Sequence, residues 1–232
     1  MKKSKILYTI LSGAILFMIT FSSCDVEDSA DVNQDKIYTV YEAFYNSNTD
    51  KTWIIARFRF GGPTGTLLEL NEPALVTFEG EELPYNPVFL GHYKEFAGRI
   101  TSGEFVYTNT EEVTFTNSLP ASETIQFPAE LESISRSNAF SLEWDGTTLK
   151  ENERVGLFVG SWTWGQDAAF LQINEGASDL VLGKDQLENL PDGQSTFYMD
   201  RTTEVDVAEG TSEGGVVRAT FRAENINVDI TE

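Results

Sequence analysis

The stretch "TWIIARFRF", residues 52–60, decides the fold class because its side chains alternate in character with a period of two. One face of the resulting strand would carry Ile54, Ala56, Phe58 and Phe60, and the other Trp53, Ile55, Arg57 and Arg59. Alternation of this kind is typical of a strand with one face in a core. The stretch therefore predicts a half-buried β-strand.

The same period recurs along most of the chain from residue 36 onward. Further strands are predicted at 37–45, 74–79, 104–108, 112–116, 123–127, 139–144, 154–159, 168–173, 195–200, 216–222 and 225–230. Glycine- and proline-containing turns separate them, and the helix-like stretch of note is "KDQLENL", residues 184–190. Since no repeated helix is available for parallel crossovers, the sequence predicts an all-β fold of antiparallel sandwiches.

The length of this β-rich region predicts two tandem modules. Residues 36–232 are about twice the roughly 100 residues of one seven-stranded sandwich. The polar stretch "NSLPAS", residues 117–122, marks the best boundary, so the modules are expected at 36–118 and 119–232. Trp144 alternates with two apolar residues just before a turn, which resembles the core tryptophan of immunoglobulin-like and fibronectin-like domains. We expect it at the centre of the second core.

The N-terminus predicts export and lipidation. Three lysines within residues 2–5 precede an apolar run at 6–21, and the run is short for a membrane span. "FSSC", residues 21–24, resembles a bacterial lipobox, with Phe21 in place of the usual leucine. That resemblance implies a signal peptide at 1–23 and acyl chains on Cys24, the single cysteine of the chain. A retained signal anchor and an incidental cysteine are the alternatives.

Acidic residues dominate the segment that follows. Residues 25–35 contain five acids and no base, which predicts a disordered, lipidated tether over 24–35. Acids directly after the cysteine resemble the surface-export signal of some Gram-negative lipoproteins, which implies the cell surface at the outer membrane. Removing 1–23 takes three of 16 bases and leaves 13 against 37 acids, a formal charge of −24. Such a chain repels nucleic acid, so we expect no nucleic-acid partner.

The residues that usually carry catalysis are scarce. The one histidine, His92, lies among turn and aromatic residues, and we expect it to be a structural group rather than a catalytic base. No Gly-x-Ser-x-Gly elbow occurs, and "GSWTWG", residues 160–165, lacks its spacing. A glycosidase needs just two carboxylates, but nothing singles out a pair among the 37 acids. We therefore predict that the protein is not an enzyme.

Calcium is the cofactor for which the sequence offers candidate ligands. The stretch "EVDVAEGTSEGG", residues 204–215, gathers acids among glycines without matching the EF-hand spacing. The candidate ligands are Glu204, Asp206, Glu209 and Glu213. We expect these residues to form an acidic hairpin loop instead, because acids favour exposed loops. Beyond calcium, no cofactor is predicted.

Two aromatic groups are candidate binding residues. Trp162 and Trp164 are two apart, so in a strand they would share a face and form a flat platform for sugar rings. Large aromatic side chains are usually buried, and we therefore expect them to close the end of a sandwich instead. Tyr85 and Tyr93 lie on the long stretch at 83–96 and form a second candidate binding loop.

These features predict a non-enzymatic, lipid-anchored protein of the bacterial envelope that acts as a binding or scaffolding module. Its partners would be the membrane, through Cys24, and a glycan or an envelope protein. The alternative is a polysaccharide-binding accessory protein or a carboxylate-dependent glycan hydrolase. Turnover of a glycan that depends on one carboxylate would favour that alternative.

Lipidation is tested at the cysteine itself. Cys24→Ser should leave the precursor without acyl chains, because the sulfur is the atom that would carry them. Metabolic labelling with a fatty-acid analogue measures this, and the wild-type protein should take up label while the variant does not. A wild-type protein without label would contradict the prediction.

Overall fold

Strand β3 (Lys51–Phe60) has the alternation that its sequence predicts. In the computed structural model, which describes residues 26–232, Ile54, Ala56 and Phe58 are fully buried. On the other face, Trp53, Arg57 and Arg59 keep part of their surface exposed, whereas Ile55 is 4% exposed. The fold is therefore mostly β, as predicted, and the predicted signal peptide and Cys24 lie outside the described residues.

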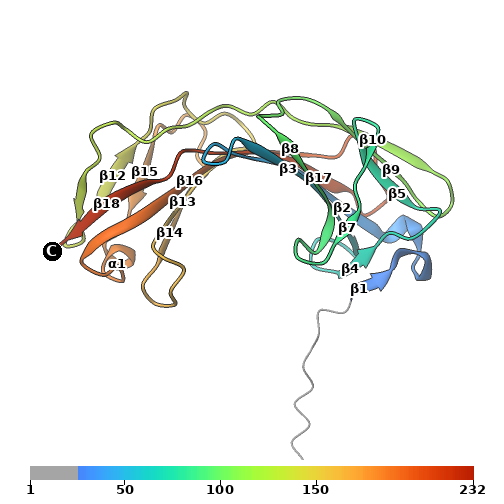
Figure 1. Ribbon diagram of the computed structural model, residues 1–232, viewed down its shortest axis with the longest axis horizontal. Coiled ribbons are helices and arrows are strands. Elements are labelled where there is room, and N and C mark those ends of the chain that lie inside the picture. The colour runs from blue at the N-terminus through green and yellow to red at the C-terminus, as the bar shows by residue number, and fades with distance from the viewer. Residues whose placement is uncertain (1–25) are drawn as a thin grey trace, which may run out of the picture.

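A 12-stranded sheet runs through the whole molecule, which has the shape of an arch (Figure 1). Its main path is, in order, β1 (Val26–Asp28), β4 (Thr66–Glu69), β3, β2 (Ile37–Asn46), β17 (Gly215–Arg222), β16 (Gly193–Asp206), β13 (Glu153–Val159) and β14 (Ala168–Gln172). Off this path, β8 (Gly91–Ala97) pairs with β3 and β7 (Tyr85–Asn86), and β18 (Ile226–Thr231) pairs with β16 and β11 (Ser133–Ser135).

Two smaller sheets lie on the outer side of the arch (Figure 1). One contains, in order, β10 (Thr114–Ser118), β9 (Glu104–Thr108), β5 (Leu75–Phe78) and β6 (Glu81–Glu82), and the other β12 (Phe140–Glu143) and β15 (Asp179–Leu182). The helices of the described chain are short: η1 (Ser29–Asp31), η2 (Gln34–Lys36) and α1 (Lys184–Leu187). Within residues 26–232, none is long and apolar enough to cross a membrane.

Two hydrophobic cores fill the space between the large sheet and the smaller ones. The first core draws mainly on residues 37–119 and the second on residues 125–230. Strand β17 contributes to both, with Val217 and Ala219 in the first core and Phe221 in the second. Trp144 is 6% exposed and packs in the second core, so this prediction is confirmed.

Three strand pairs among the described residues are parallel, so the expectation of purely antiparallel sheets is wrong. They are β1 with β4, β11 with β18, and β17 with β2. The β17–β2 pair joins residues about 175 positions apart, from Gly215 opposite Thr39 to Arg222 opposite Asn46. Local sequence patterns do not report such long-range pairs, which is why the prediction failed.

Three local predictions are also wrong. The expected strand at 123–127 is reduced to a single bridge between Gln126 and Asp145, and the expected helix at 184–190 ends at Leu187. The expected disordered tether is ordered from Val26 onward, because β1 pairs with β4 and the Gln34 side chain is buried. The Gln34 Nε2 donates to the carbonyls of Ser29 and Val32 within the segment, and its Oε1 accepts from the backbone amide of Thr110, which attaches the acidic segment to the body.

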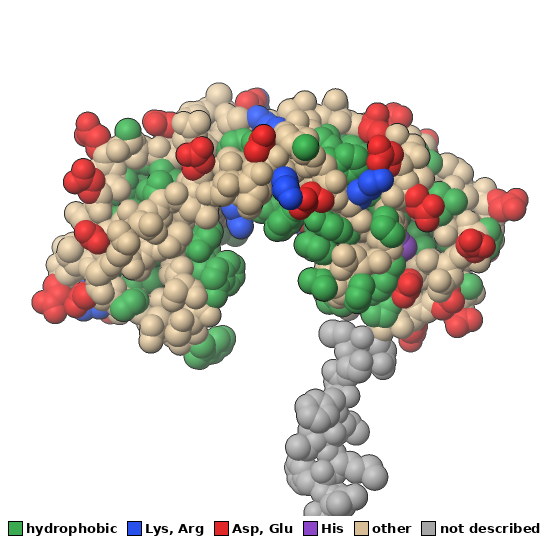
Figure 2. Space-filling view, in the orientation of Figure 1, with side chains coloured by type: hydrophobic (Ala, Val, Ile, Leu, Met, Phe, Trp, Pro, Cys, Tyr) green, Lys and Arg blue, Asp and Glu red, His purple; other side chains and the backbone are tan. Residues whose placement is uncertain are grey.

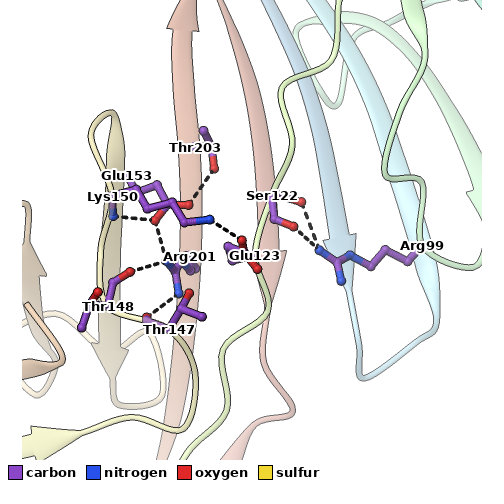
Figure 3. A network of polar contacts seen from close by, with 9 residues as sticks. All are labelled: Arg99, Ser122, Glu123, Thr147, Thr148, Lys150, Glu153, Arg201 and Thr203. Carbon is purple, nitrogen blue, oxygen red and sulfur yellow. Dashed lines mark hydrogen bonds and ion pairs between the residues drawn. The ribbon is translucent and has the colours of Figure 1, made fainter. Parts of the chain in front are cut away.

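Hydrogen bonds and ion pairs hold residues 120–124, which connect the two cores, in place (Figure 3). Arg99 donates to the carbonyl of Ser122 at 2.6 Å from the side of the first core. Lys150 forms an ion pair with Glu123 from the side of the second. Beside them, Arg201 and Glu153 form a buried ion pair, with side chains 1% and 3% exposed. The guanidinium of Arg201 also donates to the carbonyls of Thr147 and Thr148. The connection is therefore fixed rather than loose.

A close backbone approach tests the β17–β2 pairing. A Cβ atom at Gly215 would collide with the carbonyl oxygen and Oγ1 of Thr39, whereas one at Gly156 in β13 would meet open space. We expect Gly215→Ala to lower the free energy of unfolding by about 1–3 kcal/mol, because the strands must move apart. Gly156→Ala is the matched control and should change it little. Urea unfolding measures both, and equal effects would contradict the pairing.

Candidate functional site

The large sheet has one face without a covering layer, on the inner side of the arch; we call it the concave face (Figure 1). Both cores lie on the opposite face. Cross-strand partners point the same way, so the register places in one row Glu95, Trp53, Phe44, Thr220, Thr202 and Arg154. Figure 2 shows hydrophobic side chains on both inner flanks of the arch, with charged side chains between them.

Aromatic side chains form a nearly continuous strip across this face. The aromatic strip consists of Tyr93, Phe89, Trp53, Phe44, Tyr198, Phe158 and Trp162. At one end, Phe89 stacks on Tyr93 with ring centroids 4.0 Å apart. At the other, Trp162 stacks on Phe158 at 3.9 Å. In the middle, Phe44 and Trp53 of neighbouring strands stack at 5.4 Å.

Arg222 of β17 lies between Phe44 and Tyr198 in the middle of the strip. Its guanidinium lies 4.9 Å from the ring centroid of Phe44 and 5.8 Å from that of Tyr198. Two hydrogen bonds of 2.7 Å join it to both carboxylate oxygens of Asp200. Burial opposes its charge, but Asp200 raises the pKa of Arg222 overall. The strip therefore spans strands from both halves of the chain.

Ion pairs occupy the rest of the concave face. Glu204 accepts hydrogen bonds from Arg218 and Arg154, and Arg57 pairs with Glu42 at 3.4 Å. Burial alone would raise the pKa of Glu204, but the two arginines hold it below its usual value. A hollow of about 290 Å³ lies beside them, lined by Tyr38, Val40, Arg57, Arg59, Pro63 and Arg218.

Charges on this face nearly balance, unlike those of the whole chain. The register places there the bases Lys51, Arg57, Arg59, Arg154, Arg218 and Arg222. It also places there eight acids, Asp28, Glu42, Glu69, Glu95, Asp200, Glu204, Asp206 and Asp229. The chain as a whole has a formal charge of −21. The concave face is therefore suited to an uncharged ligand rather than to a strongly charged one.

The two predicted tryptophans are exposed, so the expectation that they close a sandwich is wrong. Trp162 is 68% exposed and Trp164 fully exposed. They lie in the loop between β13 and β14, where Trp162 has a φ of 62°. That turn breaks the period of two, and the shared strand face is lost with it. Trp162 belongs to the aromatic strip, whereas Trp164 extends into solvent.

The predicted tyrosine pair is divided between the two faces of the sheet. Tyr85 is paired with His92 across β7 and β8, and its ring meets the His92 ring edge-on. Tyr93, the next residue, points to the concave face and stacks on Phe89. Because neighbouring residues of a strand point in opposite directions, the two tyrosines do not form one binding loop.

The candidate calcium ligands are also held apart. Glu204 is bound to arginines on the concave face, and Asp206 is exposed at the end of β16. Glu209 accepts from the backbone amide of Thr116, and Glu213 pairs with Lys36 at 2.8 Å. Among residues 26–232, no group of three or more His, Cys, Asp or Glu side chains is placed to hold a metal ion.

His92 is the structural group that the sequence predicts. It is 5% exposed, its Nε2 accepts from the backbone amide of Leu70 at 3.2 Å, and its Nδ1 lies 2.9 Å from the carbonyl oxygen of Leu83. Both ring nitrogens are therefore occupied when Nδ1 carries the proton.

Sequence reasoning missed most of the strip, including Phe44, Phe89, Phe158, Tyr198 and Arg222. A usable signal was present in "TWIIARFRF", because Trp53 falls on the polar face of its strand. A large aromatic residue on the solvent side of an alternating strand indicates an exposed aromatic surface. Which other strands extend that surface depends on the register.

Comparisons with known proteins found no matching family model and no matching curated protein. Among solved structures, the chain is similar to a DUF3823 family protein from Bacteroides uniformis, with 12% sequence identity and a TM-score of 0.30. That match covers 83% of this chain and 99% of the other.

The buried histidine predicts a loss of stability in mild acid. Burial lowers the pKa of His92 below 6.5, against the opposing effect of the Leu83 carbonyl, so the folded protein keeps the ring neutral. The unfolded chain binds a proton below about pH 6.5, and stability should therefore fall as the pH drops from about 6.5 toward the lowered pKa. Urea unfolding between pH 7.5 and 5.5 measures this. His92→Gln should be less stable at pH 7.5 but show a flatter slope; an unchanged slope would contradict the assignment.

Proposed function

We propose that this protein is a lipid-anchored, non-enzymatic binding module of the bacterial cell surface, and that an extended glycan binds along the aromatic strip. The observation that carries the proposal is the strip itself, which crosses the concave face from Tyr93 to Trp162. Sugar rings have apolar faces that pack on aromatic rings and hydroxyl edges that hydrogen-bond to charged groups. The strip and its ion pairs offer both kinds of contact.

Several features of the strip support a glycan as the ligand. One face of Trp162 rests on Phe158, and its 68% exposure leaves the other face open for stacking. Guanidinium groups in the neighbouring hollow supply N–H donors for hydroxyl oxygens. The near balance of charge on this face favours a neutral polymer. An envelope protein is the competing ligand for the same surface.

The carboxylates of the concave face support binding without catalysis. A glycosidase needs one carboxylic acid that keeps its proton near neutral pH. Burial would raise the pKa of Glu204, but the two arginines beside it lower that pKa overall, and Asp200 accepts hydrogen bonds from Nε and Nη2 of Arg222. Neither group is suited to act as a general acid, which favours the binding module over the hydrolase.

The anchor and the two-module organisation belong to this proposal as well. Strand β1 contains Val26, two positions after the predicted lipidation site, so an acyl chain on Cys24 would lie close to the folded body. In support of two immunoglobulin-like sandwiches, each core has its own outer sheet. Strand β17 pairs with β2 and thereby joins the inner sheets of the two sandwiches into one continuous sheet.

A glycan panel tests the proposed ligand. The purified protein should bind at least one neutral polysaccharide, measured by calorimetry, and Trp162→Ala should weaken that binding about tenfold, or ~1.4 kcal/mol. Trp164→Ala is the matched control from the same loop and should leave affinity unchanged, because Trp164 lies outside the strip. The absence of any bound glycan, or equal effects of both variants, would contradict the proposal.

A further inference from the structure

Three loops of the described chain carry no base and together only one acid, Asp167. They connect β3 to β4 (61–65, "GGPTG"), β7 to β8 (87–90, "PVFL") and β13 to β14 (160–167, "GSWTWGQD"). We call these the foot loops. Charged residues make up 23% of the chain, and other hairpins are acidic, such as the β9–β10 turn with Glu111 and Glu112. The foot loops are therefore distinct from the rest of the surface.

The foot loops lie on the open side of the arch, with the start of the described chain. Leu90 and Thr64, from two of the loops, line one hollow of about 370 Å³ together with Glu27 of β1. These elements end one leg of the arch, and the β13–β14 hairpin ends the other (Figure 1). Both legs point in the same direction in that view. The described chain thus begins on the side where the foot loops are.

Exposed apolar side chains stand on these loops. Trp164 is fully exposed, Val88 is 85% exposed and Leu90 is 42% exposed. Apolar groups concentrated at loop tips mark a contact with a partner or a membrane rather than an ordinary water-facing surface. Tryptophan is the residue most typical of the interface between lipid headgroups and acyl chains.

We propose that the foot loops are a bilayer contact, with Trp164, Val88 and Leu90 at headgroup level. The proposal rests on the anchor at Cys24 from the proposed function. One residue, Asp25, lies between Cys24 and Val26, and a chain spans at most ~3.6 Å per residue, so a lipid on Cys24 would hold the start of β1 within about 7 Å of the membrane. A neutral leaflet fits best, because the chain is strongly acidic and the loops carry no base.

This contact uses residues other than those of the proposed glycan site. Trp162 turns back onto Phe158 in the aromatic strip, while Trp164, two residues on, is uncovered. In this loop, Trp162 would contact a ligand on the concave face, and Trp164 would contact the bilayer. Variants of the two residues separate the two roles.

Fluorescence quenching by lipid tests the bilayer contact. The full acylated protein is reconstituted in phosphatidylcholine vesicles that contain a lipid brominated near the headgroup. Trp164→Phe should reduce the lipid-dependent quenching of tryptophan fluorescence at least twofold. Trp144→Phe is the matched control, because Trp144 is 6% exposed in the second core, and it should change the quenching little. Equal quenching in the wild type and Trp164→Phe would overturn the proposal.

A second pair of variants tests the other leg. Val88→Asp places a charge in the foot loops and should reduce the quenching at least twofold. Val181→Asp places the same charge at another exposed valine, 60% exposed on β15 of an outer sheet, and should have no effect. Equal effects of the two would overturn the proposal. Protection of Trp164 from a soluble quencher without vesicles, together with a dimer mass by light scattering, would also overturn it in favour of a contact between copies.

Mass spectrometry of Cys24 separates failure of the anchor from failure of the contact. If Cys24 carries no acyl chain, the anchor fails, and the same quenching is then measured after its thiol is coupled to a maleimide lipid. The coupling is unambiguous because the chain has one cysteine. Quenching through Trp164 in that coupled protein supports the contact on its own, and its absence overturns it.

Discussion

The parallel pairing of β17 with β2 is the constraint on which the rest of the structure depends. It joins residues 215–222 to residues 39–46 and so connects the two halves of the chain in one sheet. Gly215 permits this approach, because a side chain there would collide with Thr39. Without this pair, each half would have its own sheet and its own outer edge. With it, both cores lie on one side, and the other side becomes one continuous concave face.

The aromatic strip is a direct consequence of that pairing. Phe44 belongs to β2, Tyr198 belongs to β16, and Arg222 of β17 lies between them in contact with both rings. Its two hydrogen bonds to Asp200 fix the guanidinium in place. A surface made of such interlocked groups is largely preformed, so a ligand would lose little free energy in ordering it.

Charge is divided between the surfaces of this protein according to what each faces. The outer hairpins carry many of the acids, the register places six bases and eight acids on the concave face, and the foot loops carry no base and one acid, Asp167. Inside, the buried Arg201–Glu153 pair is compensated by hydrogen bonds from Arg201 to two carbonyls. A strongly acidic chain can therefore present surfaces that do not repel a neutral polymer or a neutral leaflet.

The sequence by itself determined the features that depend on local pattern. Alternation in 52–60 predicted which face of β3 is buried, and the surroundings of Trp144 and His92 predicted a core residue and a structural histidine; all three are confirmed. Only the tertiary structure decided which strands are neighbours, because register joins residues up to about 175 positions apart. The strip, the separation of Trp162 from Trp164 and the folding of residues 26–36 onto the body all follow from such contacts. Local periodicity indicates whether a side chain points inward or outward. It does not indicate which distant side chain that side chain contacts.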